Sequence, residues 1–408
     1  MSALKGYRVL ELANERIAFA GKLLADMGAD VILIEPPGGD PSRHYPPFAN
    51  DEPGLERSLW WWHYNTSKRG IVLDLDTSED RERFKALVAT ADMVIETEPV
   101  SRLADLGLDY EDLRKLREDL IHVSMTPFGR GSPNAGAPVT DLTILAAAGP
   151  VWSCGYDDHT LPPIRGGGNQ GYNTGCHFAV MSALTALFYR ENSGEGQFID
   201  VSMHGASNVT TEGGSLFWLV ANQTVQRQTG RHAAVDPTDD VQFRCQDGRW
   251  VNTGVPPRAR AEFVQVLEWL TELGLVDEFP EAVFLEMGAA LEISISAAHL
   301  GVDEELTAIF GAGRSALALI ARHVRAYDFF IGCQSRGLAA GVIYSPEEAF
   351  EDPHFTARGF QVEVDHGAGE TFRYPGAPYK LPASPWAISR RAPKLGEHDE
   401  EILGGRDG

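Results

Sequence analysis

The sequence predicts an α/β fold, with a large domain built on a parallel sheet and a smaller α+β domain after it. Over residues 1–205, short runs rich in β-branched residues alternate with longer amphipathic segments, a pattern typical of parallel strands joined by crossover helices. The chain has 408 residues, of which 43% are apolar and 23% charged, so it is long enough and apolar enough for two folded domains.

The first strand–helix–strand unit shows this pattern most clearly. Strands are predicted over residues 7–12 and 31–35, and apolar residues recur between them at helical spacing until Gly28 ends the helix. A Pro-Pro-Gly-Gly cluster at residues 36–39 then predicts a loop.

Three further strands extend the predicted sheet. The third is expected over residues 71–75. Residues 77–80 supply cap-type and acidic groups for a helix that runs to about residue 91, where their charge complements the backbone dipole. Short strands over 93–95 and 121–125 follow. This order of elements is Rossmann-like, although a GxGxxG phosphate turn is absent.

A second, smaller domain is predicted after a polar connecting stretch. Segments 241–245 and 250–252 form a hairpin because Asp-Gly at 247–248 is a turn signal, and helical segments follow at 261–273 and 316–326. The predicted regions are a large domain over 1–205, a linker over 206–235, a small domain over 236–344, and a return linker over 345–408 whose end packs on the large domain.

Charge and composition exclude several classes of function. The 35 Lys and Arg against 58 Asp and Glu give a formal net charge of -23, which repels nucleic acids and anionic membranes. The N-terminus lacks a basic segment followed by an apolar one, and no apolar run reaches the ~18 residues of a membrane span, so we expect a cytoplasmic protein. The four cysteines are widely separated, which predicts reduced core thiols and no metal site.

The most informative segment runs from Pro162 to Met203. It contains a glycine-rich loop, a helix, an Arg-Glu-x-x-Gly-x-Gly-Gln turn from Arg190 to Gln197, and an Asp-Val-Ser strand at residues 200–202. These motifs resemble the signature of class III CoA-transferases, the family of formyl-CoA transferase and carnitine CoA-transferase. Further segments match that family in order along nearly the whole chain: residues 4–11, 21–43, 65–71, 128–129, 141–142 and 395–398.

The resemblance implies an enzyme that uses a CoA thioester as substrate and has no tightly bound cofactor. It also implies two chains threaded through each other as an interlocked-ring dimer, with CoA on the large domain near the boundary between subunits. Each matching segment is weak alone, and their shared order makes the assignment strong.

One position departs from the family. Family members pass the acyl group through a mixed anhydride and then an enzyme-bound thioester, both on an aspartate that precedes the aromatic residue of the helix. Here the aromatic is Tyr172 and the residue before it is Gly171, which has no nucleophile. No Asp or Glu lies between Arg165 and Arg190, so we predict no catalytic residue at this place.

Other acidic residues offer an alternative nucleophile. Asp157 and Asp158 lie in a turn that is typical of an exposed loop, and the alternative interpretation is a displaced nucleophile. Asp200 is a further alternative, although it fits better as part of a strand.

Positive charge suggests where CoA phosphates bind. Lys68 and Arg69 offer charge-assisted hydrogen bonds, with a solvated pair before a strand as the alternative. Thr97 is retained as a binding candidate because the family has an Asn-Phe pair here. Glu98 and Asp105 nearby replace groups expected to meet an anionic cofactor, which is unfavourable.

The glycine-rich loop supplies the remaining binding candidates. Gly167 and Gly168 allow close approach of a phosphate or thioester to the backbone, and Asn169 and Gln170 offer amide hydrogen bonds. The alternative is a flexible loop before a helix.

Three more features have two interpretations. The tryptophans at 60–62 could form an apolar wall for an aromatic acyl group or could pack between subunits, and packing is the favoured interpretation. His177 is more often a packed helix residue than a base. Cys176 has little weight as a nucleophile, because no basic neighbour other than His177 is evident.

The leading hypothesis is a non-nucleophilic subunit of a hetero-oligomeric class III CoA-transferase, paired with a homologous catalytic subunit. It would move CoA from an acyl-CoA such as succinyl-CoA to a dicarboxylic acid, with benzylsuccinate of anaerobic toluene degradation as one candidate. The alternatives are a homodimeric transferase with a displaced carboxylate and a catalytically inactive CoA- or acyl-binding protein. No nucleic acid or membrane partner is expected.

Overall fold

The computed structural model describes residues 2–211 and 213–404. Contacts divide the chain into two compact units. The first contains residues 1–154, 162–224 and 352–408, and the second contains residues 155–161 and 225–351. The passage from the first unit to the second at residue 225 falls inside the range that the sequence assigns to a linker.

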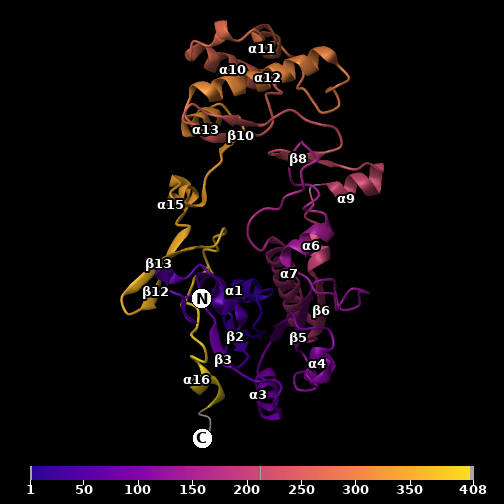
Figure 1. Cartoon of the computed structure of the whole chain (residues 1–408), viewed down its shortest axis with the longest axis vertical. Coiled ribbons are helices and arrows are strands. Elements are labelled where there is room, and N and C mark those ends of the chain that lie inside the picture. Colours follow the sequence, from indigo (N-terminus) through magenta and orange to yellow (C-terminus); the bar gives the residue numbers. More distant parts are fainter. Residues whose placement is uncertain (1, 212, 405–408) are drawn as a thin grey trace. The chain divides into compact units, whose positions relative to one another are not determined.

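The first unit is built on a six-stranded sheet with the order β3-β2-β1-β4-β5-β6. Figure 1 labels four of these strands, β2, β3, β5 and β6. Its strands are β1 (Arg8–Leu12), β2 (Asp30–Glu35), β3 (Arg69–Val72), β4 (Met93–Glu96), β5 (Ile121–Thr126) and β6 (Gln197–Ser202). All five neighbouring pairs are parallel. This is the strand order of a doubly wound α/β sheet, so the predicted fold class is confirmed.

Helices cover both faces of this sheet because its strands are apolar on both sides. Along β5, Ile121, Val123 and Met125 face a core shared with α1 (Ala18–Asp26) and α7 (Gln170–Ser193). The opposite face packs against three helices: α3 (Ser78–Val88), α4 (Arg102–Asp105) and α5 (Tyr110–Leu113). The remaining helices of the unit are α2 (Leu59–Tyr64), α6 (Asp141–Ala148), α8 (Met203–Asn208), α9 (Gly214–Leu216), α15 (Pro353–Arg358) and α16 (Asp399–Leu403).

Strand β3 begins and ends two or three residues earlier than the sequence predicts. It starts at Arg69, which pairs with Ile32 of β2. It stops after Val72 because the chain turns there, where Asp74 N donates to Asp80 Oδ2 at 2.8 Å. A side chain in the following helix therefore decides where the strand ends.

The C-terminal segment covers the outer edge of β3. His398 Nδ1 accepts a hydrogen bond from Gly70 N (3.1 Å), and Asp399 Oδ1 accepts one from Val72 N (2.8 Å). Helix α16 lies beside β3 in Figure 1, although more than 300 residues separate them in the sequence. Two backbone groups of an edge strand are thereby satisfied. A hairpin of β12 (Gln361–Gly367) and β13 (Glu370–Pro375) precedes this segment.

The second unit combines helices with small antiparallel sheets. The predicted hairpin is present as β9 (Gln242–Arg244) and β10 (Trp250–Thr253), and β11 (Ala340–Val342) adds a third strand. Helices α10, α11 and α12 lie side by side in Figure 1. The other elements are β7 (Gln226–Gln228), β8 (Arg231–Ala234), α10 (Arg260–Glu272), α11 (Ala282–Ala289), α12 (Glu304–His323), α13 (Ala326–Ser335) and α14 (Pro346–Phe350).

One predicted helix of this unit is wrong in its bounds. The segment expected at 316–326 is the second half of α12, which ends at His323, and α13 begins at Ala326 after extended backbone at Val324 and Arg325. Across residues 2–211 and 213–404, no helix is both long and apolar enough to cross a membrane.

Candidate functional site

The site predicted from the sequence lies at the start of α7, where the glycine-rich loop enters the helix. Buried Asp141, the first residue of α6, faces it. Its Oδ1 accepts hydrogen bonds from Gly171 N (2.8 Å) and Tyr172 N (3.1 Å), and its Oδ2 accepts one from Arg165 Nη1 (2.9 Å). The first turn of a helix leaves such N–H groups free, and its dipole favours an anion. We call Asp141, Arg165, Gly171 and Tyr172 the α7 junction.

Gly171 is buried within this junction and has ordinary helical backbone. A Cβ atom at this position would lie 3.1 Å from Asp141 Oδ1 and 3.3 Å from Leu145 Cγ, so a larger side chain requires a small shift of either neighbour. The carboxylate that contacts Gly171 is therefore that of Asp141. Both of its oxygens are engaged with backbone N–H groups or Arg165, which leaves it poorly suited to attack a thioester.

Replacing Asp141 with Asn tests the structural role of this carboxylate. Asn keeps the shape but loses the charge that holds Arg165 and the two N–H groups, so we expect Asp141→Asn to lower the free energy of unfolding by about 2 kcal/mol. Urea unfolding measures this change. Asp105→Asn, on an exposed residue of α4, is the control and should change stability by no more than about 0.5 kcal/mol. Equal effects of the two substitutions would contradict the assignment.

The glycine-rich loop leaves open space before the helix. Gly167 and Gly168 are exposed, and nothing lies within 4 Å of where a Cβ would stand at either residue. Gly168 has φ +79°, a conformation that favours glycine. In the described ranges, the side-chain amides of Asn169 and Gln170 form no hydrogen bond with the protein, so they are available to a ligand. Their role in CoA binding stays a prediction.

The first turns of α7 pack against the loop after β1. The Tyr172 ring is buried, and the Arg16 guanidinium carbon lies 6.0 Å from its centroid. Cys176 Sγ donates to Arg16 O at 3.1 Å, and burial raises the pKa of this thiol to about 12. Cys176 is therefore protonated at neutral pH and is not a nucleophile.

Aromatic side chains of α2 line the neighbouring surface. Trp60 lies 4.4 Å from Tyr64 between ring centroids, and Tyr64 Oη accepts a long hydrogen bond from Asn173 Nδ2 of α7 (3.4 Å). Phe19 contacts both Tyr64 and the exposed ring of His177, edge to face. This cluster places aromatic surface beside the first turn of α7.

The other two tryptophans of α2 pack elsewhere. Trp61 is buried, with its Nε1 donating to Pro393 O (3.1 Å) and the Arg43 guanidinium carbon 3.9 Å from its ring centroid. Trp62 packs against His366 of the C-terminal hairpin. Packing therefore accounts for Trp61 and Trp62, and only Trp60 belongs to the surface near the α7 junction.

His63 in α2 should make the protein less stable in mild acid. Burial lowers its pKa to about 4, below the ordinary 6.5. A depressed histidine pKa contributes stability above pH 6.5 that is lost as pH falls toward 4, because the unfolded chain then binds the proton and the folded chain does not. We expect His63→Gln to reduce the loss of stability between these pH values by about 2 kcal/mol, measured by urea unfolding at several pH values.

The control for this prediction is His354→Gln, on an exposed histidine. It should leave the slope of stability against pH unchanged. A wild-type slope in His63→Gln would show that His63 titrates normally in the folded protein.

Lys68 and Arg69 lie in ion pairs. Lys68 is completely buried, and its Nζ donates to Glu11 Oε1 (2.8 Å), Ala18 O (2.9 Å) and Asn65 Oδ1 (2.8 Å). Arg69 donates to both carboxylate oxygens of Asp30 and to Glu401. All three N–H groups of Lys68 are used, so a phosphate would have to displace one of these partners.

Thr97 lies at the end of β4 and is buried, and its Oγ1 has no hydrogen-bond partner in the part of the chain that the structure describes. Beside it, burial and the nearby Glu96 carboxylate raise the pKa of Glu98. Across residues 2–211 and 213–404, no hydrogen bond or ion pair joins Thr97, Lys68 or Arg69 to the glycine-rich loop. The structure therefore places the predicted binding residues at separate points of the sheet.

The acidic turn before the loop is exposed. Asp157 pairs with Arg231 of β8 (2.7 Å), and Asp158 accepts hydrogen bonds from Thr160. Both belong to the second unit, outside the α7 junction. Asp200 lies on β6, where Arg130 N donates to its carboxylate (2.9 Å).

Two carboxylates near the α7 junction escaped the sequence reasoning. In the sequence, Asp141 belongs to a segment that matches the family, and a Thr-Asp pair before an apolar run is a helix-start signal that identifies it. Glu15, in the loop after β1, is partly buried, and burial raises its pKa above the ordinary range despite a hydrogen bond from Tyr45. No motif marks Glu15 in the sequence.

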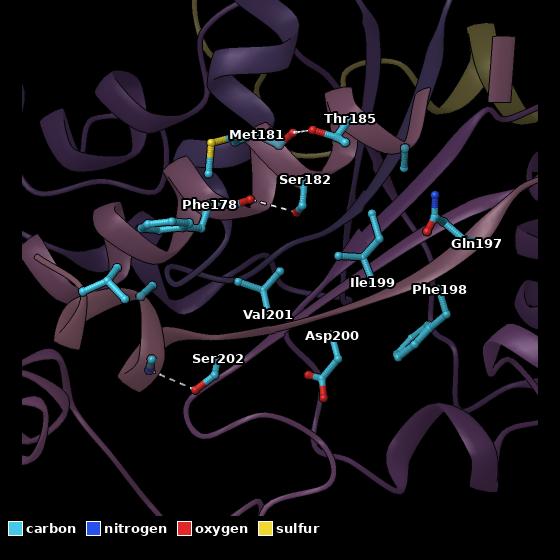
Figure 2. A pocket seen from close by; sticks show the side chains of 14 residues that line it. Phe178, Met181, Ser182, Thr185, Gln197, Phe198, Ile199, Asp200, Val201 and Ser202 are labelled. Carbon is cyan, nitrogen blue, oxygen red and sulfur yellow. Dashed lines mark hydrogen bonds between the residues drawn. The ribbon is translucent and has the colours of Figure 1, made fainter. Parts of the chain in front are cut away.

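A groove of about 790 Å³ runs between α7 and β6. In Figure 2, Ile199 and Val201 point toward α7, whereas Asp200 points away from it. Two apolar side chains of its wall are more than half exposed, Met181 at 56% and Val209 at 66%. Since β6 is the last strand of its sheet, the groove lies on an edge with no covering element from the described chain.

Comparison with protein families gives the class of protein. The chain matches the family model described as CoA-transferase family III over residues 4–399. It therefore belongs to CoA-transferase family III, and the predicted resemblance is confirmed.

Several individual proteins are similar to this chain along nearly its whole length. The chain is 31% identical over 402 residues to the succinyl-CoA:(R)-benzylsuccinate CoA-transferase subunit BbsE of Thauera aromatica, covering 97% of this chain and 92% of that protein. It is 30% identical to a succinate–glutarate CoA-transferase of Agrobacterium fabrum, covering 98% of this chain and 94% of that protein. Among solved structures, a CAIB/BAIF family protein from Brucella suis superposes with a TM-score of 0.77 at 26% identity, covering 98% of both chains.

Proposed function

We propose that this chain is the non-nucleophilic subunit of a hetero-oligomeric CoA-transferase, in which a homologous chain supplies the catalytic aspartate. The donor is a CoA thioester such as succinyl-CoA and the acceptor is a dicarboxylic acid, with benzylsuccinate as the leading candidate. The glycine at position 171, beside a fully engaged Asp141, is the observation that supports this most directly.

The proposed division of labour follows from the chemistry of transfer. An aspartate oxygen of the partner attacks the thioester carbonyl, the C–S bond breaks, and CoA leaves as thiolate. The thiolate then attacks the aspartyl carbonyl of the mixed anhydride and the first carboxylate leaves. The acceptor carboxylate then attacks the aspartyl thioester, and the CoA thiolate leaves. This thiolate attacks the acceptor's carbonyl in the new mixed anhydride, which gives the product thioester and frees the aspartate. This chain offers the open loop at Gly167 and Gly168, the amides of Asn169 and Gln170, and the aromatic surface around Trp60 as binding groups.

One observation supports a different chain as partner, and a second supports a subunit contact in general. BbsE is described as a subunit, and its similarity extends over 97% of this chain. The groove between α7 and β6 exposes apolar side chains at the edge of a sheet, a kind of surface that subunit contacts cover.

The succinyl donor is supported by the names of the relatives, since the benzylsuccinate enzyme and the mesaconate enzyme of Haloarcula marismortui are both described with succinyl-CoA.

Reconstitution tests this proposal. The purified chain alone should show no CoA transfer from succinyl-CoA to benzylsuccinate, and activity should appear when it is co-expressed with the homologous aspartate-containing chain from its native source. Without the partner's nucleophile, turnover should be lower by about 10⁴-fold or more, so the chain alone and the co-expressed pair should differ clearly in activity. Full activity of the chain by itself would show that the proposal is wrong.

Glu15 supports a second candidate, a homo-oligomeric transferase with a displaced carboxylate. Its raised pKa and its place in the loop that packs against Tyr172 make it a better candidate than Asp157, which is held by Arg231. Glu15→Gln should abolish transfer under this alternative. Under the main proposal, the wild-type chain alone is already inactive, so Glu15→Gln has no activity to remove.

A further inference from the structure

A small pocket of about 280 Å³ lies in the first unit, on the face of the sheet away from α7. It is formed by β5, β6, the start of α5 and the loop after β5, and none of the α7 junction lines it. Its lining residues are Leu103, Asp109, Tyr110, Glu111, His122, Arg130 and Phe198. Nothing in the proposed transfer reaction uses this pocket.

The imidazole of His122 is buried, and it has no hydrogen-bond partner in the part of the chain that the structure describes. The residue is 1% exposed, and neither ring nitrogen has a hydrogen-bond partner among the described residues. The Glu96 carboxylate lies beside it, but its Oε1 is 3.5 Å from Nε2, beyond a good hydrogen bond. Buried polar groups are normally satisfied, because leaving one unpaired is unfavourable. His122 lines the pocket, so a bound group that reaches one of its ring nitrogens would satisfy it.

The walls around His122 are aromatic. The Phe198 ring centroid lies 5.4 Å from the His122 centroid, nearly edge to face, and the Tyr110 centroid lies 5.7 Å from that of Phe198. Leu103 adds aliphatic surface. Rings at these angles favour a planar aromatic guest, which meets their edges and faces. The volume admits a single ring with a small substituent.

Charge disfavours an anionic guest. Asp109 and Glu111 lie at the pocket, and the one cation among its lining residues, Arg130, already donates to Ser124 Oγ (3.0 Å) and Glu96 Oε1 (3.4 Å). Glu111 has a long ion pair with Arg114 (3.7 Å) and Asp109 accepts a hydrogen bond from Asp112 N, but an added carboxylate would still lie near both of these like charges. A neutral ligand avoids this repulsion.

We propose that this pocket binds a small neutral aromatic molecule whose hydroxyl or ring N–H group pairs with a nitrogen of His122. A neutral imidazole offers one donor and one acceptor, so a phenol-type hydroxyl matches either nitrogen.

Nitrogen-15 NMR of the histidine side chains in the full chain tests this directly. The probes are phenol, toluene as the matched apolar ring, and benzoate as the anion. Phenol should shift the ring-nitrogen resonances of His122 saturably, with about tenfold tighter binding than toluene, since one buried hydrogen bond distinguishes them. Benzoate should bind more weakly than phenol.

Substitution provides the second arm. In His122→Phe the preference should disappear, with phenol bound about tenfold more weakly than by the wild-type chain and toluene retained. His354→Gln, far from the pocket in sequence and exposed, should change nothing. Equal binding of phenol and toluene by the wild-type chain, or no shift at His122 with phenol, would overturn the proposal and leave a pocket that holds water only. The wild-type measurement decides the question even if His122→Phe fails to fold.

Discussion

Lys68→Met should lower the free energy of unfolding at neutral pH by about 3–5 kcal/mol, because it leaves the Glu11 carboxyl unpaired in the interior, where it is either an uncompensated charge or has to bind a proton. Both side chains are completely buried, and Glu11 Oε2 has no other partner in the described structure. Urea unfolding at neutral pH measures the change. If Lys68 instead serves mainly to bind CoA phosphates, the substitution will weaken CoA binding and leave stability almost unchanged.

Arg69→Met is the matched control, one residue further along the chain, where β3 begins. Its pair with Asp30 is partly exposed, so its loss should lower stability by about 1 kcal/mol or less. The double substitution Lys68→Met with Glu11→Leu should recover most of the loss, because apolar residues often replace a buried ion pair without penalty. A double variant as unstable as Lys68→Met would show that the effect comes from packing and not from charge.

The pH dependence gives an independent check. Burial already raises the pKa of Glu11 to about 7 while Lys68 lowers it, so removal of Lys68 pushes the pKa higher. A raised carboxyl pKa means that the folded state keeps the proton. The penalty is therefore absent below the unfolded pKa of about 4.5, grows as pH rises from there toward the folded pKa, and is constant above the folded pKa. The deficit of Lys68→Met should shrink toward pH 5.

The sheet could be predicted because each strand is a short apolar run that needs no distant information. Segments 93–95 and 121–125 were expected within a residue of β4 and β5. Their burial on both faces makes the local composition sufficient. Strand β3 was shifted, since its end depends on the Asp80 side chain six residues later.

The candidate site was less predictable because its partners are remote in the sequence. Lys68 was expected to bind phosphate, and Glu11, which neutralises it, lies 57 positions away. Asp141 was missed as part of the α7 junction because it lies 30 positions before Gly171. A single charged residue gives no sign of whether another chain segment will pair it. By contrast, the sequence alone shows that residue 171 is a glycine, which has no nucleophilic side chain.

Restoring the carboxylate gives the second large effect. Gly171→Asp places a nucleophile at the family position, and the new Cβ meets Asp141 Oδ1 at 3.1 Å, which requires only a small shift. After incubation with succinyl-CoA, we expect covalent acylation or CoA attachment on this chain at a level on the order of 100-fold above wild type. Intact-protein mass spectrometry of the full chain, with its partner present, measures the adduct.

Gly171→Asn is the matched control, since it has the same size and shape but no carboxylate to attack a thioester. It should form no adduct, like wild type. The gain in Gly171→Asp should stay well below the roughly 10⁶-fold that a natural nucleophile contributes, because the neighbouring Asp141 charge raises the pKa of a second carboxyl and lowers the fraction of it that is ionised. An adduct on the wild-type chain at a glutamate or aspartate elsewhere, with Glu15 as the first to test, would locate a nucleophile in this chain and refute the proposed division of labour.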